Sequence, residues 1–147
     1  MKKKLLVSAC LLGECCRYDG KSKEYDRVLR LKDKYELVPV CPEVMGGLPV
    51  PRPGSEICFG RVVNTKGEDV TENFLKGANE ALRIARENRI TLALLKERSP
   101  SCGKGKIYDG SFSGKLIDGN GVTAGLLSDF GIKIFGESEI DLLLKNS

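Results

Sequence analysis

The sequence contains no histidine among its 147 residues. Histidine is the commonest general base and one half of the Cys–His nucleophile pair, so its absence argues against both kinds of catalysis. It also excludes the usual zinc site that mixes cysteine and histidine ligands. Any metal that this chain binds must therefore rest on sulfur and oxygen atoms.

The chain also has little net charge and no long apolar run. Its 24 Lys and Arg against 20 Asp and Glu give a formal net charge of +4, too small and too dispersed to indicate nucleic-acid binding. No apolar run approaches the roughly 20 residues that cross a bilayer, and the first strand lacks the apolar core of a signal peptide. We therefore expect a cytoplasmic protein without membrane contact. Its six cysteines are then expected to be free, metal-bound or reactive rather than paired in structural disulfides.

Short apolar segments alternate with helical patterns along the chain. Strands are predicted at residues 5–8, 35–40, 90–95 and 132–135. Helices are predicted at residues 26–34, 122–129 and 139–144, and the clearest helix begins with Thr71 as its capping residue. The pattern indicates an α/β protein that forms one compact domain over residues 1–147. It predicts a mostly parallel open sheet with flanking helices and a cluster site at the carboxyl ends of the strands.

The remaining stretches are predicted to be loops or short β excursions. Residues 45–54 are rich in proline and glycine, and a loop of this length suits a wall or lid over a site. Residues 56–63 predict a β excursion that bends at Gly60, inside which Cys58 is interpreted as a packed, buried thiol. Residues 108–121 are interpreted as a glycine-rich loop with one short strand.

Three cysteines share one position relative to the predicted strands. Cys10 follows the first strand, Cys41 follows the second and Cys102 follows the third across a short loop. In open α/β sheets the carboxyl ends of the strands line the ligand crevice, so these thiols are expected to converge although they lie far apart in the sequence.

Three thiolates are too few for a closed zinc tetrahedron, which needs four ligands. They suit a cubane iron–sulfur cluster in which one iron is left for a ligand that is not part of the protein. A zinc site completed by water or Glu43 is an alternative, as is a fourth cysteine ligand from Cys15 or Cys16. A thiol enzyme without metal is a further alternative, although it lacks a histidine base.

Several motifs together resemble one protein family, the thiouracil desulfurases, in order and along essentially the whole chain. The matching segments are Ser8-Ala-Cys10-Leu-Leu-Gly13, Cys16-Arg-Tyr-Asp-Gly20, Cys41-Pro-Glu43, Pro51-Arg-Pro53, Asp69-Val-Thr71, Ser99-Pro-Ser-Cys102-Gly103 and Tyr108-Asp-Gly110.

The resemblance implies a single α/β domain that holds a 4Fe–4S cluster on Cys10, Cys41 and Cys102. It implies that the protein removes sulfur from a small-molecule thiolated nucleobase, a 2-thiouracil-like uracil, to leave uracil. The catalytic candidates that it implies are Glu43, for proton transfer, and Ser101, for positioning or polarising the base.

The implied chemistry is also sound on general grounds. The carbon of a thiocarbonyl group becomes more electrophilic when an iron draws electron density through its sulfur, and water can then attack if a base takes its proton. Glu43 is the only acidic residue within three positions of any of the three cysteines. The competing hypothesis is a non-catalytic iron–sulfur or zinc module that senses metal or redox state through the same thiols.

Overall fold

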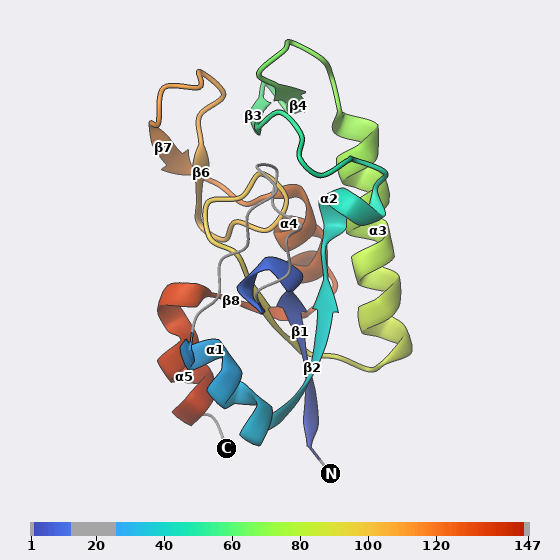
Figure 1. The fold of residues 1–147 in the computed structure, drawn as a ribbon, viewed down its shortest axis with the longest axis vertical. Coiled ribbons are helices and arrows are strands. Elements are labelled where there is room, and N and C mark those ends of the chain that lie inside the picture. The colour runs from blue at the N-terminus through green and yellow to red at the C-terminus, as the bar shows by residue number, and fades with distance from the viewer. Residues whose placement is uncertain (1, 13–25, 146–147) are drawn as a thin grey trace.

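The computed structural model describes residues 2–12 and 26–145, and within them a four-stranded parallel sheet forms the centre of the molecule (Figure 1). Its strands are β1 (Lys3–Ser8), β2 (Tyr35–Val40), β5 (Leu92–Leu95) and β8 (Lys133–Gly136). They lie in the order β2-β1-β5-β8, and all three neighbouring pairs are parallel. The chain moves to one side of β1 for β2 and to the other side for β5 and β8. The end of β1 beside β5 is therefore the switch point at which open α/β sheets bind ligands.

The central strands β1 and β5 are buried on both faces of the sheet, to which their successive side chains point in turn. Leu5, Val7, Leu92 and Leu94 pack in one core, whereas Leu6, Ala93 and Leu95 pack in the other. Neither β1 nor β5 has a polar face in this part of the sheet. Each fully buried leucine stabilises the fold by roughly 1.5–3 kcal/mol relative to an exposed one. This burial holds the sheet between two helical layers.

The helical layers come from different parts of the chain. The first core includes side chains from α1 (Asp26–Arg30), the 3-10 helix η2 (Leu31–Asp33) and α5 (Ile140–Lys145). The second includes side chains from α3 (Thr71–Glu87) and α4 (Val122–Asp129). Two short helices, η1 (Ala9–Leu11) and α2 (Pro42–Met45), follow the carboxyl ends of β1 and β2, and η3 (Glu137–Glu139) follows β8.

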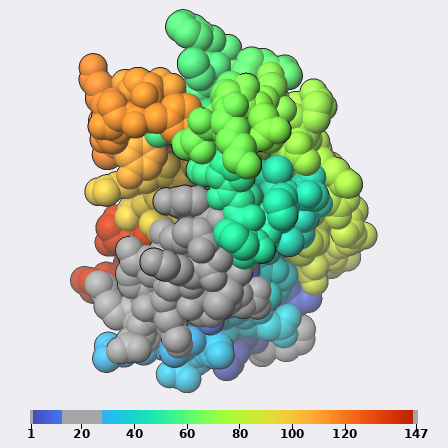
Figure 2. Space-filling view, turned by 45° about the horizontal axis from the view of Figure 1, so that its top comes forward, coloured from blue at the N-terminus to red at the C-terminus, as the bar shows by residue number. Residues whose placement is uncertain are grey.

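Two antiparallel hairpins stand above the carboxyl ends of the strands. One consists of β3 (Ser55–Cys58) and β4 (Arg61–Asn64), and the other of β6 (Lys106–Tyr108) and β7 (Leu116–Asp118). Figure 2 shows the β6–β7 region in orange beside the β3–β4 region in green. Glu56 joins the two, because its Oε1 accepts hydrogen bonds from the backbone N–H groups of Gly110 at 3.0 Å and Phe112 at 3.1 Å.

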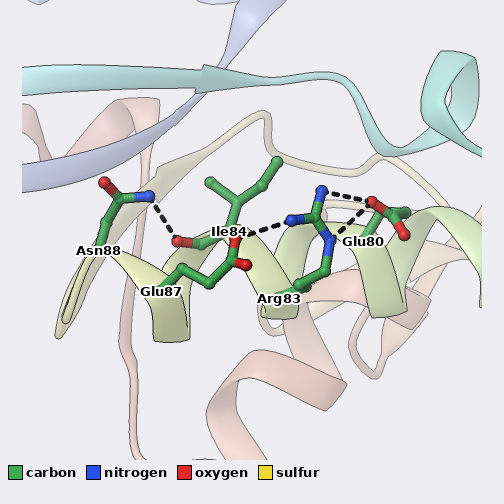
Figure 3. Close-up of polar contacts among 5 residues, drawn as sticks. All are labelled: Glu80, Arg83, Ile84, Glu87 and Asn88. Carbon is green, nitrogen blue, oxygen red and sulfur yellow. Dashed lines mark hydrogen bonds and ion pairs between the residues drawn. The ribbon is translucent and has the colours of Figure 1, made fainter.

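The outer face of α3 is polar, which leaves its apolar face for the core. Arg83 donates from Nη2 to Oε2 of Glu80 at 2.9 Å and from Nη1 to Oε2 of Glu87 at 2.7 Å, as Figure 3 shows. The side-chain amide of Asn88 donates to the carbonyl oxygen of Ile84 at 2.8 Å, beyond the last helical residue. No helix within the described residues is long and apolar enough to cross a membrane.

The predicted elements agree with this fold in type and order, apart from shifted ends, the unpredicted α2 and β6, the start of α3 and the burial of Cys58. Thr71 is the first helical residue rather than the cap; its hydroxyl accepts the N–H of Val62 at 2.8 Å, while Oδ1 of Asp69 accepts the N–H of Thr71 at 2.9 Å. Cys58 is half-buried rather than buried, because its strand belongs to a two-stranded hairpin. The stretch expected to be a loop with one short strand contains β7, as predicted, while β6 begins before it and was not predicted.

Candidate functional site

A cavity of about 980 Å³ lies at the carboxyl ends of β1, β2 and β5. The sheet supplies its floor through residues that end these strands or follow them directly: Ser8, Ala9, Cys10, Val40, Cys41 and Lys96. The proline-rich loop supplies another wall through Pro51, Arg52 and Pro53, and Tyr108 and Phe112 reach it from the β6–β7 hairpin. The expectation that residues 45–54 contribute a wall over the site is therefore confirmed in part.

The three sequence-predicted cysteines all line this cavity. Cys10 is buried in η1, which begins directly after β1. Cys41 is half-buried between β2 and α2, where Pro42 occupies the first turn of the helix. Cys102 is buried in the loop that follows β5. The parallel register explains the convergence, because it brings the carboxyl ends of β1, β2 and β5 to the same edge of the sheet.

The surroundings of Cys102 oppose its ionisation. Burial raises the pKa of the Cys102 thiol to about 12, and the negative charges of Glu43 and Cys41 add to the increase. Hydrogen bonds from the Ser8 and Ser101 hydroxyls to the sulfur lower the pKa of Cys102 and offset part of that effect. The thiol therefore remains protonated near neutral pH until a positive charge comes close enough to stabilise the thiolate.

Thiols in this arrangement do not meet at one point. In the part of the chain that the structure describes, no three Cys, Asp or Glu side chains are close enough together to hold a single metal ion. A 4Fe–4S cluster makes a different demand, because each cysteine binds its own iron atom. Cys15 and Cys16, the alternative ligands, lie outside the described residues.

Glu43 faces the cavity from the first turn of α2. The position of α2 is fixed by close packing on α3: a Cβ atom on Gly77 would lie 1.8 Å from the carbonyl oxygen of Pro42. Oε2 of Glu43 lies 3.3 Å from Nη2 of Arg52, and the two side chains are 19% and 3% exposed. Arg52 also donates from Nη1 to the carbonyl oxygen of Pro49 at 3.0 Å, which ties the loop to the ion pair.

Ser101 lies behind Cys102 rather than in the open part of the site. It is buried, and its hydroxyl oxygen is 2.8 Å from Oγ1 of the buried Thr123 in α4. Its carbonyl oxygen accepts the N–H groups of Thr123 at 2.7 Å and Ala124 at 3.1 Å. Ser101 is not among the described residues that line the cavity. A direct contact between Ser101 and a substrate stays a prediction.

The structure adds three residues to which the sequence assigns no role. Arg52 pairs with Glu43, the Ser8 hydroxyl lowers the pKa of the Cys102 thiol, and Lys96 places its ammonium group 2.7 Å from Oε2 of Glu137. All three line the cavity. Only the positions of these residues in the sequence could have indicated a role. Ser8 and Lys96 end or follow predicted strands, and Arg52 stands between two prolines in the predicted wall.

Known proteins resemble this chain over nearly its whole length. The sequence model of the family described as 2-thiouracil desulfurase matches residues 5–139. YbbK of Bacillus subtilis (strain 168), described as an uncharacterized protein, is 42% identical over 150 residues, which cover 95% of this chain and 99% of YbbK. A solved structure of the 4Fe–4S-dependent thiouracil desulfidase TudS matches with a TM-score of 0.90 at 45% identity and covers 97% of this chain and 98% of that one. The segment that the family model matches includes all three cavity cysteines and Glu43.

Proposed function

This chain belongs to the 2-thiouracil desulfurase family, and from that membership we propose that it removes the sulfur atom of a thiolated uracil with a 4Fe–4S cluster, leaving uracil. The single observation that carries the proposal is the shared cavity of Cys10, Cys41 and Cys102 at the ends of three neighbouring strands. Three thiols at one edge of a sheet are the donor set that a cluster with one open iron requires.

The residues present fit such a cluster in charge as well as in number. A thiolate at Cys102 would stand near the Glu43 carboxylate and the Cys41 sulfur, and the negative charge of each of these two groups disfavours its ionisation. A positively charged cluster core offsets that repulsion, so the thiols can ionise as they bind. We therefore assign Cys10, Cys41 and Cys102 as its ligands. When bound, the cluster supplies an iron that acts as a Lewis acid toward the sulfur of the substrate.

Glu43 is the proposed proton-transfer group. Its carboxylate faces the cavity and is held by Arg52, so its position is fixed before a substrate binds. It takes a proton from the water that attacks the thiocarbonyl carbon and returns a proton to the departing sulfur. The overall reaction consumes one water and yields the carbonyl base and hydrogen sulfide. Ser101 retains, from the family resemblance, the proposed role of positioning or polarising the base.

The proposed substrate is a small molecule rather than a nucleic acid. A volume of about 980 Å³ lies at the upper end of the range usual for small-ligand sites. The charged residues on its wall are of both signs: the acids are Glu43, Glu56 and Glu97, and the bases are Arg52, Lys66, Lys96 and Arg98. Such a wall offers donors and acceptors to a pyrimidine and lacks the single positive sign that a phosphate backbone requires.

We also propose that residues 1–147 work as one domain in the cytoplasm. One cavity receives residues from Ser8 to Phe112, which supports a single functional unit. The thiols of Cys10, Cys58 and Cys102 are free, as is usual in a reducing compartment.

Anaerobic reconstitution with iron and sulfide, followed by incubation with 2-thiouracil, tests the function. We expect uracil and sulfide to appear in equal amounts, and we expect neither from protein without iron. A stoichiometric cluster that turns over none of several thiolated bases would contradict the enzyme and favour the sensing module instead. A reconstituted Cys58→Ser variant is the matched control, because Cys58 lies in β3 and does not line the cavity.

A further inference from the structure

One side of the cavity is aromatic. Among the described residues that line the cavity, the aromatic side chains are Tyr108 and Phe112, and both come from the β6–β7 hairpin. Phe112 is 41% exposed although it lines the cavity, so it lies at the opening rather than on the floor with the cysteines. A phenyl ring in this place is suited to cover one face of a planar ring that lies over the floor.

The backbone of Phe112 is held in an unusual conformation. Its φ angle is 57°, in the left-handed region that bulky residues rarely adopt. Such a conformation costs free energy and persists only where neighbouring contacts impose it. Inside the turn, Oδ1 of Asp109 accepts the N–H of Ser111 at 2.9 Å, and the N–H of Asp109 donates to the carbonyl oxygen of Lys115 at 3.0 Å. The turn therefore fixes the direction in which the ring of Phe112 leaves the backbone.

Glu56 fixes the turn to the rest of the cavity wall. Its Oε1 accepts the N–H of Gly110 at 3.0 Å and the N–H of Phe112 itself at 3.1 Å. The two hairpins also touch directly at Gly110, whose φ angle is 93° and where a Cβ atom would lie 2.7 Å from the carbonyl oxygen of Ile57. Glu56 lines the same cavity as Phe112. One carboxylate oxygen thus holds the residue that carries the ring.

We propose that Phe112 stacks on the face of the thiolated base and that Glu56 is a positioning residue that holds Phe112 in place through its backbone. The inference rests on the proposed function, because it requires a thiolated base above the cysteines. Stacking on a ring face contributes to the bound substrate and to the transition state alike, so its loss raises KM and leaves kcat largely unchanged. It also favours flat, unsaturated rings over puckered ones with the same thiocarbonyl group.

The first test is steady-state turnover of 2-thiouracil by the anaerobically reconstituted protein. Phe112→Ala is expected to raise KM roughly 10-fold and to keep the iron content, whereas Phe112→Tyr keeps a ring and should stay near the wild type. Phe59→Ala is the matched control, because Phe59 also has a positive φ angle, 48°, at the turn of the other hairpin, but is fully exposed and does not line the cavity. A wild-type KM in Phe112→Ala, or an equal rise in Phe59→Ala, would overturn the inference.

The second test separates the role of Glu56 from that of the ring. Glu56→Ala should raise KM about as much as Phe112→Ala, and Glu56→Gln should recover most of the loss because an amide oxygen still accepts both N–H groups. The double variant Glu56→Ala with Phe112→Ala should be no worse than Phe112→Ala alone. Losses that add would show that Glu56 does not act through Phe112. Glu68→Ala is the control, since Glu68 also accepts a hydrogen bond beside this hairpin, from Asn64 at 3.0 Å, but does not line the cavity.

A comparison of two substrates covers the case in which Glu56→Ala does not fold. In dihydro-2-thiouracil the ring double bond is saturated, so the ring is puckered while the thiocarbonyl group is retained. The preference of the wild type for 2-thiouracil, as the ratio of kcat/KM values, is expected to fall in Phe112→Ala. An unchanged preference would overturn this inference alone. A wild-type protein with a full cluster that converts neither compound would overturn the proposed function together with it.

Discussion

Two arginine–glutamate contacts in this molecule use the same chemical groups in opposite surroundings. Arg52 and Glu43 meet in the cavity wall, where the side chains are 3% and 19% exposed. Arg83 meets Glu80 and Glu87 on the outer face of α3 (Figure 3), where Arg83 is 54% exposed and its partners are 40% and 60% exposed. Water screens the charges of the exposed set but has little access to the cavity pair. An ion pair can therefore fix the geometry of the site, whereas the pairs on the helix contribute little to stability.

The two sets also differ in what holds their partners together. On α3, residues three and four positions apart are neighbours on any helix, so these pairs follow from local geometry. Glu43 and Arg52 belong to a short helix and a proline-rich loop, which meet because α2 packs closely on α3 and the loop returns over the cavity. The cavity pair therefore depends on the whole fold, and disturbing the cavity should have larger consequences than disturbing the helix surface.

The largest effect expected from a change in the cavity is loss of the cluster. Replacing Cys10, Cys41 or Cys102 with Ser should abolish or strongly reduce iron binding, because each supplies one of three proposed ligands. Cys58→Ser should keep most of the iron, since Cys58 lies outside the cavity, and so should replacement of Cys15 or Cys16. Iron and sulfide analysis after anaerobic reconstitution provides the measurement. Loss confined to the Cys15 or Cys16 variants would show that the ligand assignment is wrong.

The next effect concerns rate. Glu43→Gln keeps nearly the same volume but removes proton transfer, so turnover of 2-thiouracil should fall by roughly 10²–10⁴-fold. The iron content should not change. Turnover and iron are to be measured on the same preparation, with Glu80→Gln as the control, because Glu80 is the matching carboxylate of the exposed pair. Normal turnover in iron-replete Glu43→Gln protein would remove Glu43 from the mechanism, and loss of both would give it a structural role.

A third effect concerns stability. Arg52→Met should lower the free energy of unfolding by about 2 kcal/mol, because it leaves a largely buried carboxylate without its cation and removes the donor to Pro49. Urea unfolding of the iron-free protein measures this quantity without a contribution from the cluster. Arg52→Lys keeps the charge but not the forked donors, and it should recover part of the loss. An unchanged midpoint in Arg52→Met would mean that the cavity pair is no more important than a surface pair.

The sequence predicted the central fold well, because periodic apolar patterns are local signals. Residues 35–40 and 122–129 match β2 and α4 at both ends, and the third strand is shorter than predicted by two residues at its start. The predicted cap of α3 was wrong for a non-local reason: the hydroxyl of Thr71 accepts a hydrogen bond from the N–H of Val62, across the β4–α3 connection. The one short strand predicted within residues 108–121 corresponds to β7, whereas β6 was not predicted because it has three residues and only one buried side chain, too little to form an apolar run.

The candidate site was predictable to the level of strand ends and no further. The convergence of Cys10, Cys41 and Cys102 follows from the parallel order of the strands, which the sequence indicates. The ion pair of Arg52 could not be predicted, because it depends on the path of a loop without regular structure. The burial of Ser101 behind Cys102 could not be predicted either, since it depends on the close approach of Gly121 to the backbone of Ser101.

A fourth test uses an ion pair that is about as exposed as those of Arg83, Asp69 with Arg61, whose side chains are 46% and 54% exposed. Hydrogen bonds from Thr71 and Arg61 lower the pKa of Asp69 to about 2, from an ordinary value of 3.8. Because protonation then favours the unfolded chain, Asp69 stabilises the protein above about pH 4, and this contribution is lost as the pH falls toward 2. Urea midpoints between pH 5 and pH 2 should therefore fall less steeply in Asp69→Asn than in the wild type. Equal slopes would show that Asp69 does not contribute to acid unfolding.

The smallest effect should come from the exposed set itself. Arg83→Met removes both ion pairs of Figure 3 and keeps a long side chain with a good helix propensity, so only the charge interactions are tested. Both pairs face solvent at high dielectric constant, and holding three long side chains in one geometry costs entropy that offsets their attraction. The thermal midpoint in physiological salt should stay within experimental error of the wild type, and turnover should be unchanged. The double variant Arg52→Met with Arg83→Met should be no less stable than Arg52→Met alone, because the two sites share no residue. If Arg83→Met destabilised the chain as much as Arg52→Met does, burial in the cavity wall would not be what separates the two pairs, and the special position assigned to Arg52 and Glu43 would lose its physical basis.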